Sequence, residues 1–361
     1  MARMRNWGLG LAAALLLAAC GGGGDGDQSP RVRYSKMVVF GDSLSDVGSY
    51  RTPGIAAQGG GKYTVNGADA KIWVERLASQ AGVAAPCAAQ TGLEASGPLA
   101  ALAAPITNVA GCFGYAQGGA RVTNPIGPAN KALLALGNTQ GYLGQITDPV
   151  INQMNRHLAA AGGTFAADDL VLVLAGGNDV FMNLATLQAT VGAGGDPTAA
   201  ATAAVTAMGQ AGAELAAYVQ NLVVARGAQR VVVVNLPDVS KTPFAYSLDA
   251  QTQGLILTMS ATFNQQLAAG LGNAPQVLLV DAFTQSQNQA ASPAQYGIAN
   301  VTVPACDLAV AQLGSLACSA ATLIPGDTSR YQFADGVHPT PYGYQLLAQY
   351  VAEQMIRRGW L

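Results

Sequence analysis

Charged side chains are scarce in this chain of 361 residues. Only 11% of the residues are Asp, Glu, Lys or Arg, and the formal net charge is −2. No block of basic residues occurs, so nucleic acid is not expected as a partner. Downstream of Cys20, no apolar run is long enough for a transmembrane helix. Histidine is scarcer still, and a chain with two histidines offers few choices for a general base.

The spacing patterns typical of metal ligands are also missing. The chain has no Cys-x-x-Cys pair and no cluster of histidines, so a metal site is not expected. Four of the five cysteines follow the N-terminal region, and an even number in an exported chain suggests disulfides. Three pairings of four cysteines are possible. The local pairing is favoured, and it joins Cys87 to Cys112 and Cys306 to Cys318.

The N-terminal region is typical of an export signal. Arg3 and Arg5 precede a short apolar stretch, 8–19, which is too short to span a bilayer and ends in small residues. The sequence Leu-Ala-Ala-Cys-Gly at 17–21 resembles a bacterial lipobox. This predicts a signal peptide at 1–19 and lipidation of Cys20. An ordinary signal peptide with an incidental cysteine is the alternative.

The segment after the signal is rich in glycine and polar residues. Residues 20–33 are therefore predicted to be a flexible tether that carries the lipid. Position 21 is not aspartate, so the usual inner-membrane retention signal is absent. The expected location is the cell envelope, anchored by lipid in the outer membrane. A periplasmic or secreted protein is the alternative.

Apolar runs alternate with helix-like segments through the rest of the chain. Runs rich in Val and Leu are typical of strands buried on both faces of a parallel sheet. These runs lie at 37–40, 170–175, 231–236 and 277–280. Helices are predicted at 72–81, 144–161, 199–226, 260–271 and 342–358, and surface insertions at 86–105, 191–197 and 286–330. The alternation predicts one three-layer α/β domain over 34–361.

A serine stands directly after the first of these runs. The block Gly-Asp-Ser-Leu-Ser-Asp at 41–46 begins where the strand ends, at the sheet edge where ligands bind. Ser43 is either a nucleophile or only a helix cap, since Ser-x-x-Asp is a capping pattern. Asp42 and Asp46 are expected to hold the turn and cap the helix. Position 45 is Ser, so the Gly-x-Ser-x-Gly elbow of α/β-hydrolases is absent.

Of the two histidines, His338 has a carboxylate at useful spacing. Asp335 precedes it by three residues, so this carboxylate can bind one ring nitrogen and leave the other to accept a serine proton. Alternatively, both residues serve a loop and a helix cap, although Thr340 already supplies a cap. His157 lies in a predicted helix without such an acid and is expected on the helix surface.

Acyl transfer also requires donors for the negative charge that develops on the carbonyl oxygen. The backbone N–H of Ser43 at the start of a helix is one. Paired glycines at 118–119 allow a backbone N–H to approach substrate closely. Asn178 follows the run 170–175 and can point its amide into the same site. A turn in which Asp179 caps the next helix explains that segment equally well.

Taken in order, the blocks at 41–45, 114–120, 176–179 and 335–338 resemble the GDSL, or SGNH, hydrolase family. The resemblance covers about residues 34–358. It implies a three-layer α/β/α sandwich with a central, mainly five-stranded parallel sheet. The second block of the family usually begins with Asn, and this chain has Gly114 there. A supporting hydrogen bond is therefore absent or supplied otherwise.

The resemblance also implies the role of each residue. Ser43 is the nucleophile, and Asp335 and His338 complete the triad. Gly119 and Asn178 supply oxyanion donors beside the Ser43 N–H, with Gly118 as the competitor of Gly119.

The function implied is hydrolysis of carboxylic esters through an acyl-serine, with no metal or organic cofactor. The motifs look like those of the bacterial lipase, phospholipase and acyltransferase branch, so lipid or other acyl esters are the expected substrates. An acyltransferase or a polysaccharide deacetylase on the same machinery is the first alternative. A non-catalytic binding lipoprotein is the second.

Overall fold

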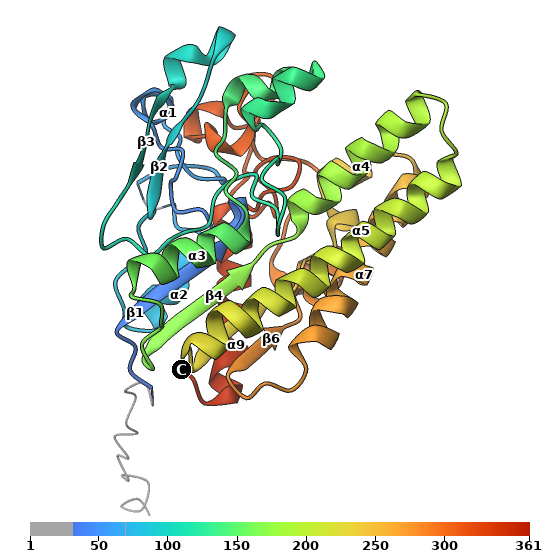
Figure 1. The fold of residues 1–361 in the computed structure, drawn as a ribbon. Coiled ribbons are helices and arrows are strands. Elements are labelled where there is room, and N and C mark those ends of the chain that lie inside the picture. The colour runs from blue at the N-terminus through green and yellow to red at the C-terminus, as the bar shows by residue number, and fades with distance from the viewer. Residues whose placement is uncertain (1–31, 69) are drawn as a thin grey trace, which may run out of the picture.

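The computed structural model describes residues 32–68 and 70–361. The expected signal peptide at 1–19, Cys20 and most of the tether at 20–33 lie outside these residues. A central parallel sheet has the strand order β1-β4-β5-β6 (Figure 1). Its strands are β1 (Lys36–Gly41), β4 (Asp169–Leu174), β5 (Arg230–Val234) and β6 (Val277–Val280). All four predicted runs are therefore strands.

Helices cover both faces of this sheet. Successive side chains of β1 point into two separate cores, with Val38 and Phe40 in one and Met37 and Val39 in the other. The helices α3 (Val150–Ala160), α5 (Pro197–Tyr218) and α7 (Ala250–Leu271) contribute to the first core. The helices α2 (Trp73–Gln80) and α9 (Pro341–Arg358) contribute to the second (Figure 1). The predicted three-layer α/β/α architecture is confirmed.

The sheet has four strands in the described structure, where five were expected. Residues 113–117 lie along the free edge of β1, with Val39 N donating to Phe113 O at 2.9 Å and Tyr115 N to Val39 O at 2.8 Å. Only an isolated parallel bridge, between Val39 and Gly114, forms there. This segment lacks a run of β-branched residues and turns away into the glycine pair at 118–119. It occupies the place of a fifth strand without forming one.

Several helix boundaries differ from the predicted ones for local reasons. The helix α3 begins at Val150 because Pro149 is its N-cap. The helix α7 begins ten residues earlier than predicted, at Ala250, where the Asp249 carboxylate accepts from Thr252 N. The helix α4 (Gly177–Gly192) was not predicted, and the glycine-rich break at 191–197 is its turn into α5. The remaining helices are α1 (Pro53–Ala57), α6 (Pro243–Tyr246) and α8 (Ala282–Ala291).

The predicted insertions carry three of the four disulfide-bonded cysteines, all but Cys112. The segment 86–105 contains β2 (Gln90–Leu93) and the start of β3 (Ala104–Asn108), which pair antiparallel. Cys87 is bonded to Cys112 and Cys306 to Cys318, which is the local pairing. The segment 286–330 begins inside α8 and continues as short turns. None of the helices in the described part of the chain is both long and apolar enough to cross a membrane.

His157 is a core residue, so its predicted place on a helix surface is wrong. It is fully buried, and its ring contacts Phe40, Tyr115 and Phe165. The buried face of α3 runs through Val150, Gln153, Met154 and His157 at helical spacing. Neither ring nitrogen of His157 has a hydrogen-bond partner within residues 32–68 and 70–361. Burial lowers the pKa of this imidazole to about 4.

Replacing His157 by phenylalanine is expected to make the protein less sensitive to acid. The imidazole has a pKa of about 4 when folded and about 6.5 when unfolded. The unfolded chain therefore binds the extra proton between these pH values, and the native protein loses stability as pH falls. Through this imidazole the free energy of unfolding of the wild-type protein falls by about 2 kcal/mol between pH 7.5 and 5, and His157→Phe abolishes that decrease. Urea unfolding of both proteins at the two pH values measures it, and identical pH dependences would contradict it.

Candidate active site

Ser43 lies in a single turn of 3-10 helix, Ser43–Ser45, immediately after β1. The residue that caps this turn is Asp42, whose carboxylate accepts from Leu44 N at 3.0 Å. Burial raises the pKa of Asp42 to about 7. Because Asp42 supplies the cap, the Ser43 hydroxyl is left for another partner. The capping alternative for Ser43 is thus not what the structure shows.

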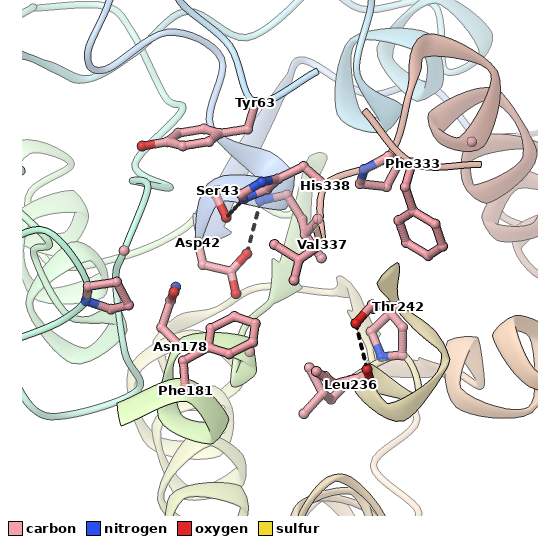
Figure 2. Close-up of a pocket in the computed structure, with 18 of the residues that line it drawn as sticks. Asp42, Ser43, Tyr63, Asn178, Phe181, Leu236, Thr242, Phe333, Val337 and His338 are labelled. Atoms are coloured by element: carbon pink, nitrogen blue, oxygen red, sulfur yellow. Dashed lines mark hydrogen bonds between the residues drawn. The ribbon is translucent and has the colours of Figure 1, made fainter. Parts of the chain in front are cut away.

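The Ser43 hydroxyl meets His338, which comes from the loop before α9. Nε2 of His338 lies 2.8 Å from Ser43 Oγ, although the two residues are 295 positions apart in the chain. Nδ1 of the same ring lies 2.8 Å from Oδ2 of Asp335 and 2.9 Å from Oδ1. Figure 2 shows Ser43 and His338 side by side at one wall of a pocket. The structure therefore brings together the three residues that the sequence placed in a triad.

Asp335 is held as an anion by its surroundings. Burial alone would raise its pKa, but the His338 ring beside it and hydrogen bonds to the carboxylate lower the pKa well below the usual value. Ser315 N donates to Oδ2, and the backbone N–H groups of Val337 and His338 donate to Oδ1. An ionised Asp335 favours the tautomer with the proton on Nδ1. Nε2 is then free to accept a proton from Ser43.

Of the two backbone N–H groups of the glycine pair at 118–119, one donates a hydrogen bond within the described part of the protein and the other does not. Gly118 N donates to Oδ2 of Asp46 at 2.9 Å. The N–H of Gly119 has no partner among the described residues, and Gly119 lines the same pocket as Ser43. A Cβ on Gly119 would lie 2.6 Å from Thr147 Cγ2, and the backbone has a φ of +77°, so only glycine fits. These contacts favour Gly119 over Gly118 as the oxyanion donor.

Asn178 lies in the first turn of α4 and is almost fully buried. Its Nδ2 donates to the carbonyl of Ala120 at 2.9 Å, which leaves the second hydrogen of the amide for another acceptor. In Figure 2 the amide points toward Asp42 and Ser43. Asp179 does not cap α4, because its carboxylate accepts from Arg121 Nε and Val122 N instead. The capping interpretation of this segment is therefore wrong.

Position 114 has no room for the asparagine that is usual there. A Cβ on Gly114 would lie 2.8 Å from both Cys87 O and Val47 Cγ2. The segment after the Cys87–Cys112 disulfide packs onto this glycine, with Gly114 N donating to Cys87 O at 2.9 Å. The hydrogen bond from Gly118 N to Asp46 holds the turn that follows. Asp46, which the sequence assigned to the turn after β1, thus also positions the second block.

Tyr63 was not predicted to belong to the site. Its ring lies 4.8 Å from the His338 ring, centroid to centroid, and its hydroxyl accepts from Gln145 Nε2 at 2.6 Å. A Cβ on Gly118 would lie 2.0 Å from the Tyr63 hydroxyl oxygen. Tyr63 therefore packs against both the histidine and the glycine pair. No sequence pattern marks it, because it lies in a segment without regular secondary structure.

The cavity in front of Ser43 has a volume of about 470 Å³, and most of its lining surface is apolar. Ser43, Gly119, Asn178 and His338 lie together on its wall. The predicted insertion 286–330 contributes to this wall as well. The apolar lining includes Leu44, Leu143, Phe181, Leu236, Val239, Phe333 and Leu347. Such a cavity accommodates an apolar group that is attached to the reacting carbonyl.

Two proteins of Pseudomonas are similar to this chain over more than 90% of its length. Esterase EstA of Pseudomonas aeruginosa is 28% identical over 366 residues, which cover 94% of this chain and 49% of that protein. An uncharacterised protein from the trpE-trpG intergenic region of Pseudomonas putida is 29% identical over 336 residues, which cover 91% of this chain and 49% of that protein. The chain spans about half the length of these curated relatives.

Among solved structures, a lipase from a goat rumen metagenome covers 90% of this chain and 98% of its own, with 14% identity and a TM-score of 0.37. The sequence model of the GDSL-like lipase/acylhydrolase family matches residues 37–351, which include all four blocks. The chain belongs to the GDSL-like lipase/acylhydrolase family.

Proposed function

We propose that this protein hydrolyses carboxylic esters through a covalent acyl-serine. The observation that carries the proposal is the continuous contact from Ser43 Oγ through the His338 ring to Asp335. Ser43 Oγ attacks the ester carbonyl while Nε2 of His338 accepts its proton. The same nitrogen then returns the proton to the leaving alcohol. Water repeats the sequence on the acyl-serine and releases the acid.

We assign three donors to the carbonyl oxygen as it becomes negative. They are the backbone N–H groups of Ser43 and Gly119 and the side-chain amide of Asn178. Each residue lines the cavity beside the Ser43 hydroxyl. Donors fixed in advance in a site with little water stabilise the tetrahedral intermediate strongly. This arrangement supports acyl transfer rather than simple binding.

The lining of the cavity favours an apolar acyl group. Most of the lining surface is apolar and includes leucine, valine and phenylalanine side chains, which suits lipid esters or other acyl esters. Six glutamine side chains also line the cavity, so acetylated sugar is included among the substrates to be tested. Transfer to an alcohol uses the same groups as hydrolysis and is distinguished by the products.

We place the protein at the bacterial cell envelope, with a lipid on Cys20. The lipobox-like sequence at 17–21 supports the lipid, and the bonded pairs Cys87–Cys112 and Cys306–Cys318 support export to an oxidising compartment.

An activity-based probe tests the proposed function. A fluorophosphonate is expected to label the native protein once, on the peptide that contains Ser43, as read by mass spectrometry. Hydrolysis of p-nitrophenyl esters of increasing acyl length should disappear in step with labelling. Phospholipid and acetylated sugar extend the series, and an added alcohol acceptor separates transfer from hydrolysis. A folded protein that neither reacts with the probe nor cleaves any ester would instead be a binding protein.

A further inference from the structure

Tyr50 is a fully buried residue close to the glycine pair but outside the cavity lining. Its hydroxyl donates to the carbonyl oxygen of Gly118 at 2.8 Å. The same hydroxyl accepts from Thr147 N at 3.1 Å. A phenol with one donated and one accepted hydrogen bond, in a site without solvent, has a fixed orientation. Tyr50 therefore holds the Gly118 carbonyl from a position outside the cavity lining.

The carbonyl of Gly118 and the N–H of Gly119 belong to one peptide group. This peptide is trans, as are all the others described, and a trans peptide is planar. The C=O and N–H bonds of such a group point in opposite directions. A hydroxyl that holds the Gly118 oxygen on one side therefore directs the Gly119 N–H to the other side. Gly119 lines the cavity that holds Ser43, and its N–H has no partner among the described residues, which leaves it available to a substrate oxygen there.

The peptide needs such a restraint because of the residues that flank it. Gly118 and Gly119 carry no side chains, so a rotation of the peptide between them meets little steric resistance. After a flip, a carbonyl oxygen would face the cavity and repel a developing oxyanion. The hydrogen bond from Tyr50 opposes this rotation. It also polarises the peptide, which makes the N–H a better donor.

Thr147, whose N–H donates to the Tyr50 hydroxyl, has a strained backbone conformation. Thr147 is fully buried and has a φ of +50°, which is unfavourable for a β-branched residue. Its side chain packs where a Cβ on Gly119 would lie, and its Oγ1 donates to Pro125 O at 2.7 Å. Strain of this kind persists only where surrounding contacts impose it. The hydrogen bond from Thr147 N to Tyr50 is one of those contacts.

We infer that Tyr50 is a positioning residue that fixes the Gly118–Gly119 peptide with its N–H toward the oxyanion site. Because the role concerns ester hydrolysis at Ser43, it rests on the function proposed above. Tyr50 touches neither substrate nor His338, so it acts only through Gly119. Its removal should therefore impair stabilisation of the transition state and leave binding of the substrate nearly unchanged.

Tyr50→Phe is the test, with kcat and KM measured separately on a p-nitrophenyl ester. We expect kcat to fall about tenfold to hundredfold while KM stays within about twofold, a smaller loss than removal of a whole donor causes. Asn178→Ala, with an expected loss of about a hundredfold or more, is the benchmark for a missing donor. Inhibition by a trifluoromethyl ketone, which forms a tetrahedral adduct, should weaken by the same factor as kcat.

Tyr34→Phe is the matched control. Tyr34 is also buried, and its hydroxyl donates to a backbone carbonyl, that of Trp360, at 2.7 Å. It precedes β1 and lies outside the cavity lining, so the loss of its hydroxyl should leave kcat unchanged. If Tyr50→Phe does not fold, p-fluorophenylalanine and p-aminophenylalanine at position 50 replace it. Both fill the space of tyrosine, but only the amino group still donates, so only that variant should keep kcat.

The experiments distinguish a failure of the proposed ester hydrolysis from a failure of the proposed role of Tyr50. Wild-type protein without Ser43-dependent hydrolysis would remove the proposed function itself. With an active wild type, a folded variant that has no donor at position 50 and retains full kcat and inhibitor affinity would overturn the role of Tyr50 alone. Equal losses in kcat for Tyr34→Phe and Tyr50→Phe would also overturn it, since they would indicate a general effect on stability.

Discussion

Ser43→Ala is expected to lower kcat for ester hydrolysis by about 10⁴- to 10⁶-fold and to leave KM nearly unchanged. The Ser43 hydroxyl is the group on which the acyl-enzyme forms, and the nearest serine in the chain offers no substitute. Ser45 is fully buried, and its hydroxyl accepts from Trp73 Nε1 at 3.1 Å. The activity that remains should come from the oxyanion donors and from binding alone. Initial rates over a range of substrate concentrations give both constants.

Ser45→Ala provides a control with the same chemical change two residues away. It leaves the Trp73 N–H without its partner, so it should lower the melting temperature but retain most of kcat. Ser43→Ala is expected to show the reverse, with near-native stability and only the small residual activity given above. Circular dichroism and thermal unfolding establish the fold of each variant. High activity in a well-folded Ser43→Ala protein is the result that the proposed function cannot accommodate.

The residues of the candidate site were largely predictable from sequence, for a physical reason. The carboxyl ends of parallel strands meet at one edge of a sheet, so polar blocks that follow apolar runs gather there. Ser43 follows β1 and Asn178 follows β4, and β1 and β4 are neighbours in the sheet. His338 was found because it is one of two histidines and has an aspartate three residues before it. The scarcity of histidine and the spacing of Asp335 and His338 were together sufficient to select His338 as the candidate base.

The supporting residues could not be predicted in this way. Tyr50, Tyr63 and Thr147 lie in segments without regular secondary structure, where no periodicity marks the residues that turn inward. Their roles depend on contacts with the glycine pair, which lies far from them in the sequence. Tyr50, for example, is 68 positions from the Gly118 carbonyl that it holds. No local pattern in a single sequence reveals contacts between residues that lie so far apart in the chain.

The wrong prediction for His157 has its origin in polar residues at buried positions. Gln153 and His157 lie on the inward face of α3, so a pattern based on apolar residues alone misplaced the histidine. Gln153 is there because it binds the end of β1: its side chain accepts from Gly41 N at 2.9 Å and donates to Gly41 O at 2.8 Å. The helix thereby supports the turn that carries Ser43. A polar residue in the core here serves the site.

Asp335→Asn is expected to lower kcat by about 10³- to 10⁴-fold near neutral pH while KM changes little. An asparagine oxygen can still accept from the N–H groups of Val337 and His338, but its NH₂ group then faces Nδ1 of His338 and the N–H of Ser315. Nδ1 becomes an acceptor, and the ring proton moves to Nε2. A protonated Nε2 facing Ser43 cannot accept the proton of the attacking hydroxyl.

The stability of this variant should change in a defined direction as well. The pKa of Asp335 is lower in the folded protein than in the unfolded chain, so its carboxylate stabilises the fold above the unfolded pKa of about 3.9. That contribution is lost as pH falls toward the folded pKa. Asp335→Asn should therefore be less stable than wild type at pH 7, with a difference that shrinks in acid. Urea unfolding of the variant and the wild type at pH 7 and in acid measures this change in stability.

Asp169→Asn separates the catalytic effect from the loss of a buried charge. Asp169 is fully buried and pairs with Lys36 at 2.8 Å, at the opposite end of the strands from Ser43. Its replacement should also destabilise the protein, but kcat should remain near the wild-type value at temperatures where the variant is folded. Asp335→Asn should lose kcat at those same temperatures. Retention of more than about a tenth of kcat in folded Asp335→Asn would show that His338 does not depend on this carboxylate for its tautomer.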